Sequence, residues 1–308
     1  MALVLNGSGI TSANIADGTI TTDDILASDV SSLKSGRKNL IINGGFDVWQ
    51  RGTSFSSPAT GSYTADRWKV MGTVTTVSEV TNGLSITATS SDSLMQDIEA
   101  MDVKAGNYIF SFTADDYSKI NHIGCYSIGG GTHYGNATKL SDGVYSLNLA
   151  EVNRAGSAVR FEFYLDVGTV VLSNVQLELG SVATDFEHRS YGEELALCQR
   201  YYRMLATGAV SSQYLELGYT HGTAAVRVTG TLSPEMRSAP SLLSSSGTNH
   251  FYGAIPGEGK YWNTFTLISG RTNLYVIEGI PNTTVIAGRP CYVRTSNSAA
   301  YVALDAEL

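Results

Sequence analysis

Charged side chains are scarce in this 308-residue chain. They make up 16% of it, against about 25% in an average soluble protein. The chain has 20 Lys and Arg residues and 28 Asp and Glu residues, which gives a formal net charge of −8. Because nucleic acid phosphates call for a face rich in Lys and Arg, this balance argues against a nucleic acid partner.

Long apolar runs are also missing. No stretch approaches the ~18 apolar residues of a membrane span. The first residues, MALVLNGSG, lack the basic segment and the long apolar segment of a secretory signal. The sequence therefore predicts no membrane insertion and synthesis in a cytoplasm.

Cysteine is nearly absent. The three residues, Cys125, Cys198 and Cys291, are an odd number and lie far apart. They form no disulfide framework and no pair with metal-ligand spacing. We therefore expect three small, buried, apolar side chains.

Catalytic motifs are missing as well. The five His form no HxH or HxxxH pair, and there is no GxSxG, P-loop or GxGxxG. The acidic groups Asp92, Asp97 and Glu99, and the pair at 115–116, are interpreted as solvated loop acids. A glycoside hydrolase would need two carboxyl groups placed across a sugar, which spacing within strands cannot show. We predict that the chain is not an enzyme, and keep a polysaccharide-degrading enzyme as an alternative.

Short alternating runs between glycine-rich turns fill most of the chain. Examples are YIFSF at 108–112, VRFEFYL at 159–165, YLELGY at 214–219 and CYVR at 291–294. Apolar residues at every second position, bounded by Gly, Asn and Asp, are typical of strands in sandwiches and jelly rolls. The sequence predicts an all-β protein with a jelly-roll β-sandwich over 39–189 and a C-terminal β-sandwich over 206–308.

Residues 1–38 have a different pattern. Apolar residues recur at every fifth position, a spacing that fits neither a strand nor a helix. These residues are Leu5, Ile10, Ile15, Ile20, Ile25 and Val30. Three interpretations stay open: the axis of an oligomeric stalk, an extended arm that docks on a larger partner, and a polar disordered tail with chance isoleucines.

One helix is predicted, over 190–205. Ser190 and Glu193 have the spacing of a capping box. Leu195, Cys198, Tyr202 and Leu205 then follow at helical spacing on one face. The helix links the two β-domains, and its second apolar row would contact either another chain or both domains of the same chain.

The segment Asn39–Gln50, NLIINGGFDVWQ, opens the first domain. Asn39–Ile42 is predicted as a strand, followed by a turn at Asn43–Gly45, and this opener is expected to pair with a closing strand at 174–181. Trp49 and Trp68 are assigned to the core. The motif Asp66-Arg67-Trp68 predicts a structural ion pair.

These segments carry a family resemblance. The opener NLIINGGFDVWQRG, YTADRW at 63–68 and the closer NVQLELGS at 174–181 resemble carbohydrate-binding-module-like jelly rolls of tailed-phage tail fibres and receptor-binding proteins. GITSANIADGTITTDDI at 9–25 is similar to the N-terminal segments of phage fibres, and YGEELALCQRYY at 191–202 to their domain junction. The similarity covers about two thirds of the chain.

The resemblance implies a virion localisation and a role in host attachment. Such a fibre subunit would be a homotrimer, would attach to other virion proteins through residues 1–38, and would bind a host cell-surface glycan. The main alternative is a purely structural virion protein without a ligand, because a fold does not fix a function.

The resemblance also implies a structural Ca²⁺ near the opener and closer. The matching positions are Asp47 and Asn174. Many such modules have Glu in place of Asp47 and an acid in place of Ser173, so this chain departs from the pattern. No other cofactor is expected.

Sugar binding requires an aromatic platform with fixed polar groups, because a sugar ring has an apolar face and a rim of hydroxyls. Aromatic residues gather around two predicted glycine-rich loops, one at Gly129–Gly131 and one over Gly247–Trp262, although packing in the core or at its rim is the competing explanation for each of them. The candidates in the first β-domain are Tyr117, His122, Tyr126, His133 and Tyr134, and those in the second are His250, Phe251, Tyr252, Tyr261 and Trp262.

Overall fold

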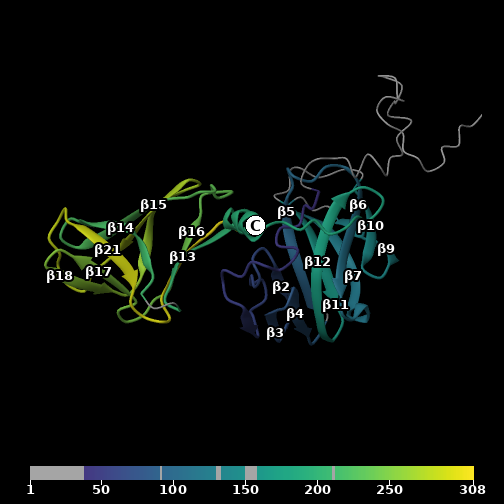
Figure 1. Ribbon diagram of the computed structural model, residues 1–308, viewed down its shortest axis with the longest axis horizontal. Coiled ribbons are helices and arrows are strands. Elements are labelled where there is room, and N and C mark those ends of the chain that lie inside the picture. The colour runs from purple at the N-terminus through teal and green to yellow at the C-terminus, as the bar shows by residue number, and fades with distance from the viewer. Residues whose placement is uncertain (1–37, 91, 130–132, 150–157, 210–211) are drawn as a thin grey trace, which may run out of the picture.

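The computed structural model describes residues 38–90, 92–129, 133–149, 158–209 and 212–308. The six apolar positions of the predicted arm, from Leu5 to Val30, lie outside this range. Figure 1 shows two β-domains joined near one short helix, with the C-terminus of the chain at the junction. No helix in the described part of the chain is long and apolar enough to cross a membrane.

The first domain is a sandwich of two antiparallel sheets, which confirms the predicted all-β class. The seven-stranded sheet contains, in spatial order, β1 (Ser54–Ser56), β3 (Thr76–Val80), β4 (Gly83–Ala88), β12 (Gly168–Leu179), β6 (Gly106–Ala114), β10 (Val144–Leu149) and β9 (Thr138–Ser141). The five-stranded sheet contains β2 (Lys69–Met71), β5 (Asp92–Glu99), β11 (Ala158–Leu165), β7 (Ile120–Ile128) and β8 (His133–Asn136). A short 3₁₀ turn, η2 (Tyr117–Lys119), precedes β7.

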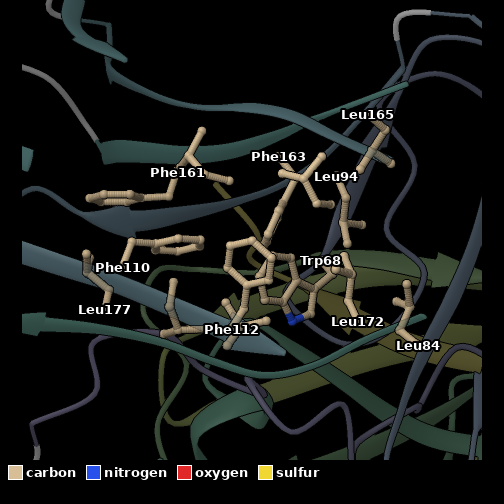
Figure 2. Packing of buried hydrophobic residues seen from close by; sticks show 14 of the residues in the cluster. Trp68, Leu84, Leu94, Phe110, Phe112, Phe161, Phe163, Leu165, Leu172 and Leu177 are labelled. Atoms are coloured by element: carbon tan, nitrogen blue, oxygen red, sulfur yellow. The ribbon is translucent and has the colours of Figure 1, made fainter. Parts of the chain in front are cut away.

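Aromatic side chains fill the space between these two sheets. Trp68 is buried against Phe46 and Phe163, with ring centroids 5.1 and 6.2 Å apart. Phe110 stacks on Phe161 at 5.9 Å, and Figure 2 shows these rings interleaved with leucines from both sheets. The core assignment of Trp68 is confirmed. Trp49 is only half-buried at the edge of the core, where its Nε1 donates to the carbonyl of Phe46.

The opener contacts the closing strand, but it is not itself a strand. The amide of Leu40 donates to the carbonyl of Leu177, and the amide of Val175 donates to the carbonyl of Gly44, both at 2.9 Å. Asn43 has a positive φ, so the chain turns away before a ladder can extend. The predicted contact between the opener and the closing strand is therefore confirmed, whereas the predicted strand over Asn39–Ile42 is wrong.

The helix α2 spans Tyr191–Gln199 and begins with the predicted capping box. The Ser190 side chain accepts from the amide of Glu193, and the Glu193 side chain reaches back to the Ser190 amide. The helix ends earlier than the predicted residue 205. From Tyr202 onward the chain forms β13 (Tyr202–Thr207), because pairing with β22 (Tyr301–Asp305) satisfies its backbone. Tyr202 and Leu205 therefore do not continue the helical stripe.

The second domain also has two antiparallel sheets. One contains β13, β22 and β16 (Ser241–Ser244). The other contains, in order, β18 (Glu258–Trp262), β17 (Phe251–Ile255), β21 (Pro290–Thr295), β14 (Tyr214–His221), β15 (Ala225–Thr231), β20 (Leu274–Gly279) and β19 (Phe265–Arg271). All three cysteines are free and buried, as predicted.

Side chains from both domains meet at the junction. Gln50 donates through Nε2 to the carbonyl of Tyr202 at 2.8 Å. The predicted ion pair at Asp66-Arg67 exists with different partners: Arg67 pairs with Glu307, and Asp66 lies 3.6 Å from Arg51. The two domains are thus connected by buried charges as well as by the chain.

Candidate functional site

The outer face of the five-stranded sheet carries an unusual set of polar and aromatic side chains. Strand β11 alternates strictly: Val159, Phe161, Phe163 and Leu165 point into the core. The residues between them, Arg160, Glu162 and Tyr164, therefore point outward. Neighbouring strands add side chains to the same face at registers fixed by the ladder.

Three of these outward residues form what we call the aromatic array: His122, Tyr126 and Tyr164. The rings of His122 and Tyr164 stack with centroids 4.1 Å apart and planes 12° apart. The hydroxyls of Tyr126 and Tyr164 are 2.6 Å apart and share a hydrogen bond. Burial, followed by the hydrogen bond to Tyr126, raises the pKa of Tyr164 above its usual value, so the Tyr164 phenol stays neutral at neutral pH.

Gly124 makes this array possible. It lies on β7 between His122 and Tyr126 and opposite Glu162 of β11. A Cβ at this position would be 2.8 Å from Cε2 of Tyr126 and 2.9 Å from Cε2 of Tyr164. The two tyrosine rings occupy the space that a side chain would take, so glycine is required for them to meet.

Ion pairs continue the face beyond the array, and we call Lys69, Asp97 and Arg160 the charged row. Asp97 accepts from Nε and Nη2 of Arg160 at 2.7 and 2.8 Å, and from Nζ of Lys69 at 3.0 Å. Burial acts to raise the pKa of Asp97, but the hydrogen bonds and charge of Arg160 outweigh it and hold the pKa below its usual value. Asp97 is therefore a fixed anion with oriented cationic neighbours.

The sequence-based interpretation of the acidic cluster is wrong for two of its members. Asp92 and Asp97 are buried rather than solvated. Asp92 accepts hydrogen bonds from the amides of Thr73 and Thr89, which tie two loop segments together. Asp92 is therefore a structural residue, while Asp97 belongs to the candidate site.

The array and the charged row are neighbours on the sheet. Arg160 lies directly opposite Tyr126 on one side and Asp97 on the other. Glu162 lies two residues after Arg160 on the same face of β11, and it accepts a hydrogen bond from the hydroxyl of Ser93. Flat rings beside fixed donors and acceptors suit a ligand that has an apolar face and a polar rim.

Two of the five candidates predicted in the first domain, His122 and Tyr126, lie in this array. Tyr117 and Tyr134 are half-buried and pack against the core instead. His133 pairs opposite Tyr126 in the ladder, but its side chain lies outside the described part of the structure. Tyr164 and Arg160 were not among the candidates, although the alternation of VRFEFYL places both on the outer face.

In the second domain, three predicted sugar contacts are core residues. Phe251 and Trp262 are fully buried and stack at 6.5 Å. His250 is buried and hydrogen-bonds the hydroxyl of Ser245 at 2.9 Å. The segment expected to be a loop is the hairpin β17–β18, whose alternation turns Phe251 and Trp262 inward. Only Tyr252 and Tyr261 of this set face outward.

The two positions implied for calcium supply few ligands. Asp47 is exposed, and Asn174 is half-buried in a left-handed conformation within β12. One carboxylate and one amide fall short of the 6–8 oxygen ligands that Ca²⁺ takes. No group of three His, Cys, Asp or Glu side chains that could hold a metal occurs among the described residues. A calcium ion at this place stays a prediction.

Comparison with known proteins assigns the chain to no family. No protein-family model matches it, and no curated protein matches it. Among solved structures, it is similar to the N-terminal CBM22-1–CBM22-2 tandem domain of Xyn10C from Paenibacillus barcinonensis, at 13% sequence identity. The match covers 89% of this chain and 97% of that chain, with a TM-score of 0.28. Because a TM-score this low supports no argument about function, the candidate site is interpreted from the side chains of this chain alone.

Proposed function

We propose that this protein binds glycans through the aromatic array and the adjacent charged row of its first domain. The observation that carries the proposal is the contact of His122, Tyr126 and Tyr164 over Gly124, beside the ion pairs of Asp97. A sugar ring would stack its C–H face on the tyrosine and imidazole rings. Its hydroxyls would exchange hydrogen bonds with Arg160 and the two phenols.

We further propose that the protein works as a fibre or adhesin subunit of a tailed-phage virion, attached to other virion proteins through residues 1–38. The motifs at 9–25, 39–52 and 191–202 support this role by their resemblance to phage fibre proteins. A homotrimer on a particle would present several weak sites at once, so that avidity replaces a single tight site. A structural virion protein without a ligand is the competing role.

The first experiment is a glycan array probed with the full chain, followed by calorimetry on the best ligand. Tyr164→Ala should lower the affinity about fivefold, because one aromatic contact contributes roughly 1 kcal/mol. Tyr301→Ala is the matched control, since this tyrosine is an exposed residue on β22 of the second domain. It should bind as the wild type does.

Two outcomes would overturn the proposal. Retention of no glycan by the wild type would leave the structural role as the better explanation. Wild-type affinity in Tyr164→Ala would move the binding site away from this face. Release of reducing sugar ends from host envelope polysaccharide would instead favour the enzyme alternative.

A further inference from the structure

The outer face of the second domain's large sheet exposes a cluster of apolar and aromatic side chains, which we call the tyrosine face. Its members are Tyr214, Leu217, Tyr219, Tyr252, Tyr261 and Tyr292. Leu217 is 65% exposed, Tyr292 is 61% exposed and Tyr214 is 60% exposed. Single exposed apolar residues are normal, but a contiguous group on adjacent strands marks an interaction surface.

The ladder shows that the face is contiguous. One row across β18, β17, β21 and β14 reads Tyr261, Tyr252, Arg294, Tyr214. The row beside it reads Ala254, Tyr292, Leu217. Their inward-facing neighbours on the same strands, Cys291 and Val293, are core residues, which fixes the orientation of the rows.

A groove of about 510 Å³ lies in this face, and Tyr214, Leu217, Ala254 and Tyr292 are among the residues that line it. Ala254 has the smallest side chain of these four residues. The face therefore has both protruding rings and a hollow of side-chain size. These are the features of surfaces that interlock with a second protein surface.

We infer that the tyrosine face is a contact surface between copies of this chain. The first argument is charge. Residues 206–308 hold 6 Lys and Arg and 6 Asp and Glu, so their net charge is zero and the −8 of the chain lies in residues 1–205. Two copies of the second domain can approach without the repulsion that the first domains would feel.

The second argument is area. Five of the six side chains are 39–65% exposed, which gives on the order of 500 Å² of contact area, given that a buried aromatic side chain contributes 150–250 Å². A stable interface buries about 800 Å² per partner, with an apolar centre and a polar rim. The face supplies such a centre, and it also carries two opposite charges, because Arg294 lies between Tyr252 and Tyr214 and Glu216 lines the groove.

The location agrees with this role. In Figure 1 the strands β14, β17, β18 and β21 lie at the end of the second domain that is distant from the first domain. The aromatic array of the first domain is on another sheet altogether. Self-association at the tyrosine face would therefore leave the proposed glycan sites free on every copy.

The chemistry of the groove favours a protein over a sugar. Its lining residues include three aliphatic side chains and only one charged group, the carboxylate of Glu216. A sugar site needs several convergent hydrogen-bonding groups, whereas an apolar hollow suits a tyrosine or leucine from another copy.

The test uses the full chain and two variants of matched size. Leu217→Lys places a charge at the centre of the face, and Ile268→Lys places one on an exposed residue of the far edge strand β19. By light scattering coupled to size exclusion, the wild type and Ile268→Lys should have the mass of an oligomer. Leu217→Lys should shift toward the mass of a single chain and keep the circular dichroism spectrum of the folded wild type.

A second measurement asks directly which protein touches the face. A photo-crosslinking amino acid at position 292 should yield covalent multimers of this chain, and the same group at position 268 should yield none. A monomeric wild type, or an oligomer without a self-crosslink from position 292, would overturn the inference. Loss of glycan binding in Leu217→Lys at unchanged mass would show a sugar site instead.

These readouts are independent of the proposed glycan site. A failure to bind glycans changes neither the mass nor the crosslinks. A failure to self-associate leaves the affinity of the single site, measured with a monovalent sugar, as it was.

Discussion

Arg67 and Glu307 form an ion pair in the interior of the molecule, although they are 240 positions apart in the chain. Both side chains are buried, and the guanidinium of Arg67 also lies 3.5 Å from the ring centroid of Tyr201. Burial acts to lower the pKa of Arg67, but the charge of Glu307 outweighs it and raises the pKa above its usual value. The pair connects the first domain to the C-terminal end of the second.

Removing one member of this pair should destabilise the protein strongly. Glu307→Gln leaves a buried guanidinium without its counter-charge, so the free energy of unfolding in urea should fall by roughly 3–5 kcal/mol. Lys139→Gln is the control, because it breaks the pair with Asp142 in which both side chains are at least half exposed. The control should change stability by less than about 1 kcal/mol. Equal effects of the two variants would show that the junction pair is not buried in solution.

Asp66, at the same junction, should give the stability of the protein an unusual pH dependence. Burial raises its pKa from 3.8 to about 6, and the lowering effects of Arg51 and Gln50 only partly oppose this. Between these values the folded protein binds a proton that the unfolded chain releases. Stability therefore rises as the pH falls from 7 to 4, in contrast to an ordinary paired carboxylate.

The measurement compares the wild type with Asp66→Asn across this range. Over the window from pH 7 to 4, the difference in unfolding free energy should shift by roughly 2–3 kcal/mol in favour of the wild type, given 1.36 kcal/mol per pKa unit. Subtracting the variant cancels the other titrating groups that both proteins share. A constant difference would mean that Asp66 keeps an ordinary pKa in the fold.

Gly124 offers a test of the aromatic array without removing any of its rings. In Gly124→Ala, the new methyl group would displace the rings of Tyr126 and Tyr164, which lie within 3 Å of its position. We expect about a tenfold loss of glycan affinity, or ~1.4 kcal/mol, measured by calorimetry. Gly192→Ala in α2, where no atom lies within 4 Å, should bind normally and be slightly more stable, since Ala favours helices over Gly.

The sequence predicts the local features of this protein well. Alternation identified most strands, and the spacing of Ser190 and Glu193 identified the start of α2. For Phe251 and Trp262 the prediction of a ligand contact is wrong, because the glycines around them indicate a loop, whereas the hairpin β17–β18 pairs the two side chains inward. Alternation within a hairpin could have corrected this.

Long-range contacts cannot be predicted from the local sequence. Nothing near Arg67 in the sequence points to Glu307, and nothing near Tyr202 shows that this residue will pair with β22 instead of continuing the helix. The aromatic array also depends on contacts between residues that are distant in the sequence. Its members come from β7 and β11, and their contact depends on a register that only the folded sheet defines.

Asn39 leads to the last prediction, since it holds the opener to the closing strand. Its Nδ2 donates to the carbonyl of Val175 at 3.1 Å, and its Oδ1 accepts from the amides of Ile41 and Leu177 at 2.9 and 3.0 Å. The side chain is buried. Asn39→Ala leaves three backbone groups without partners, so we expect a loss of roughly 2–4 kcal/mol in unfolding free energy.

Asn39→Asp keeps both acceptor bonds and loses only the donor, but it buries a carboxylate, so its stability should improve as the pH falls. Asn148→Ala, an exposed site on β10, should stay within about 0.5 kcal/mol of the wild type. If Asn39→Ala were as stable as Asn148→Ala, the opener would be held by its apolar contacts alone, and the hydrogen bonds of its first asparagine would contribute nothing to the domain.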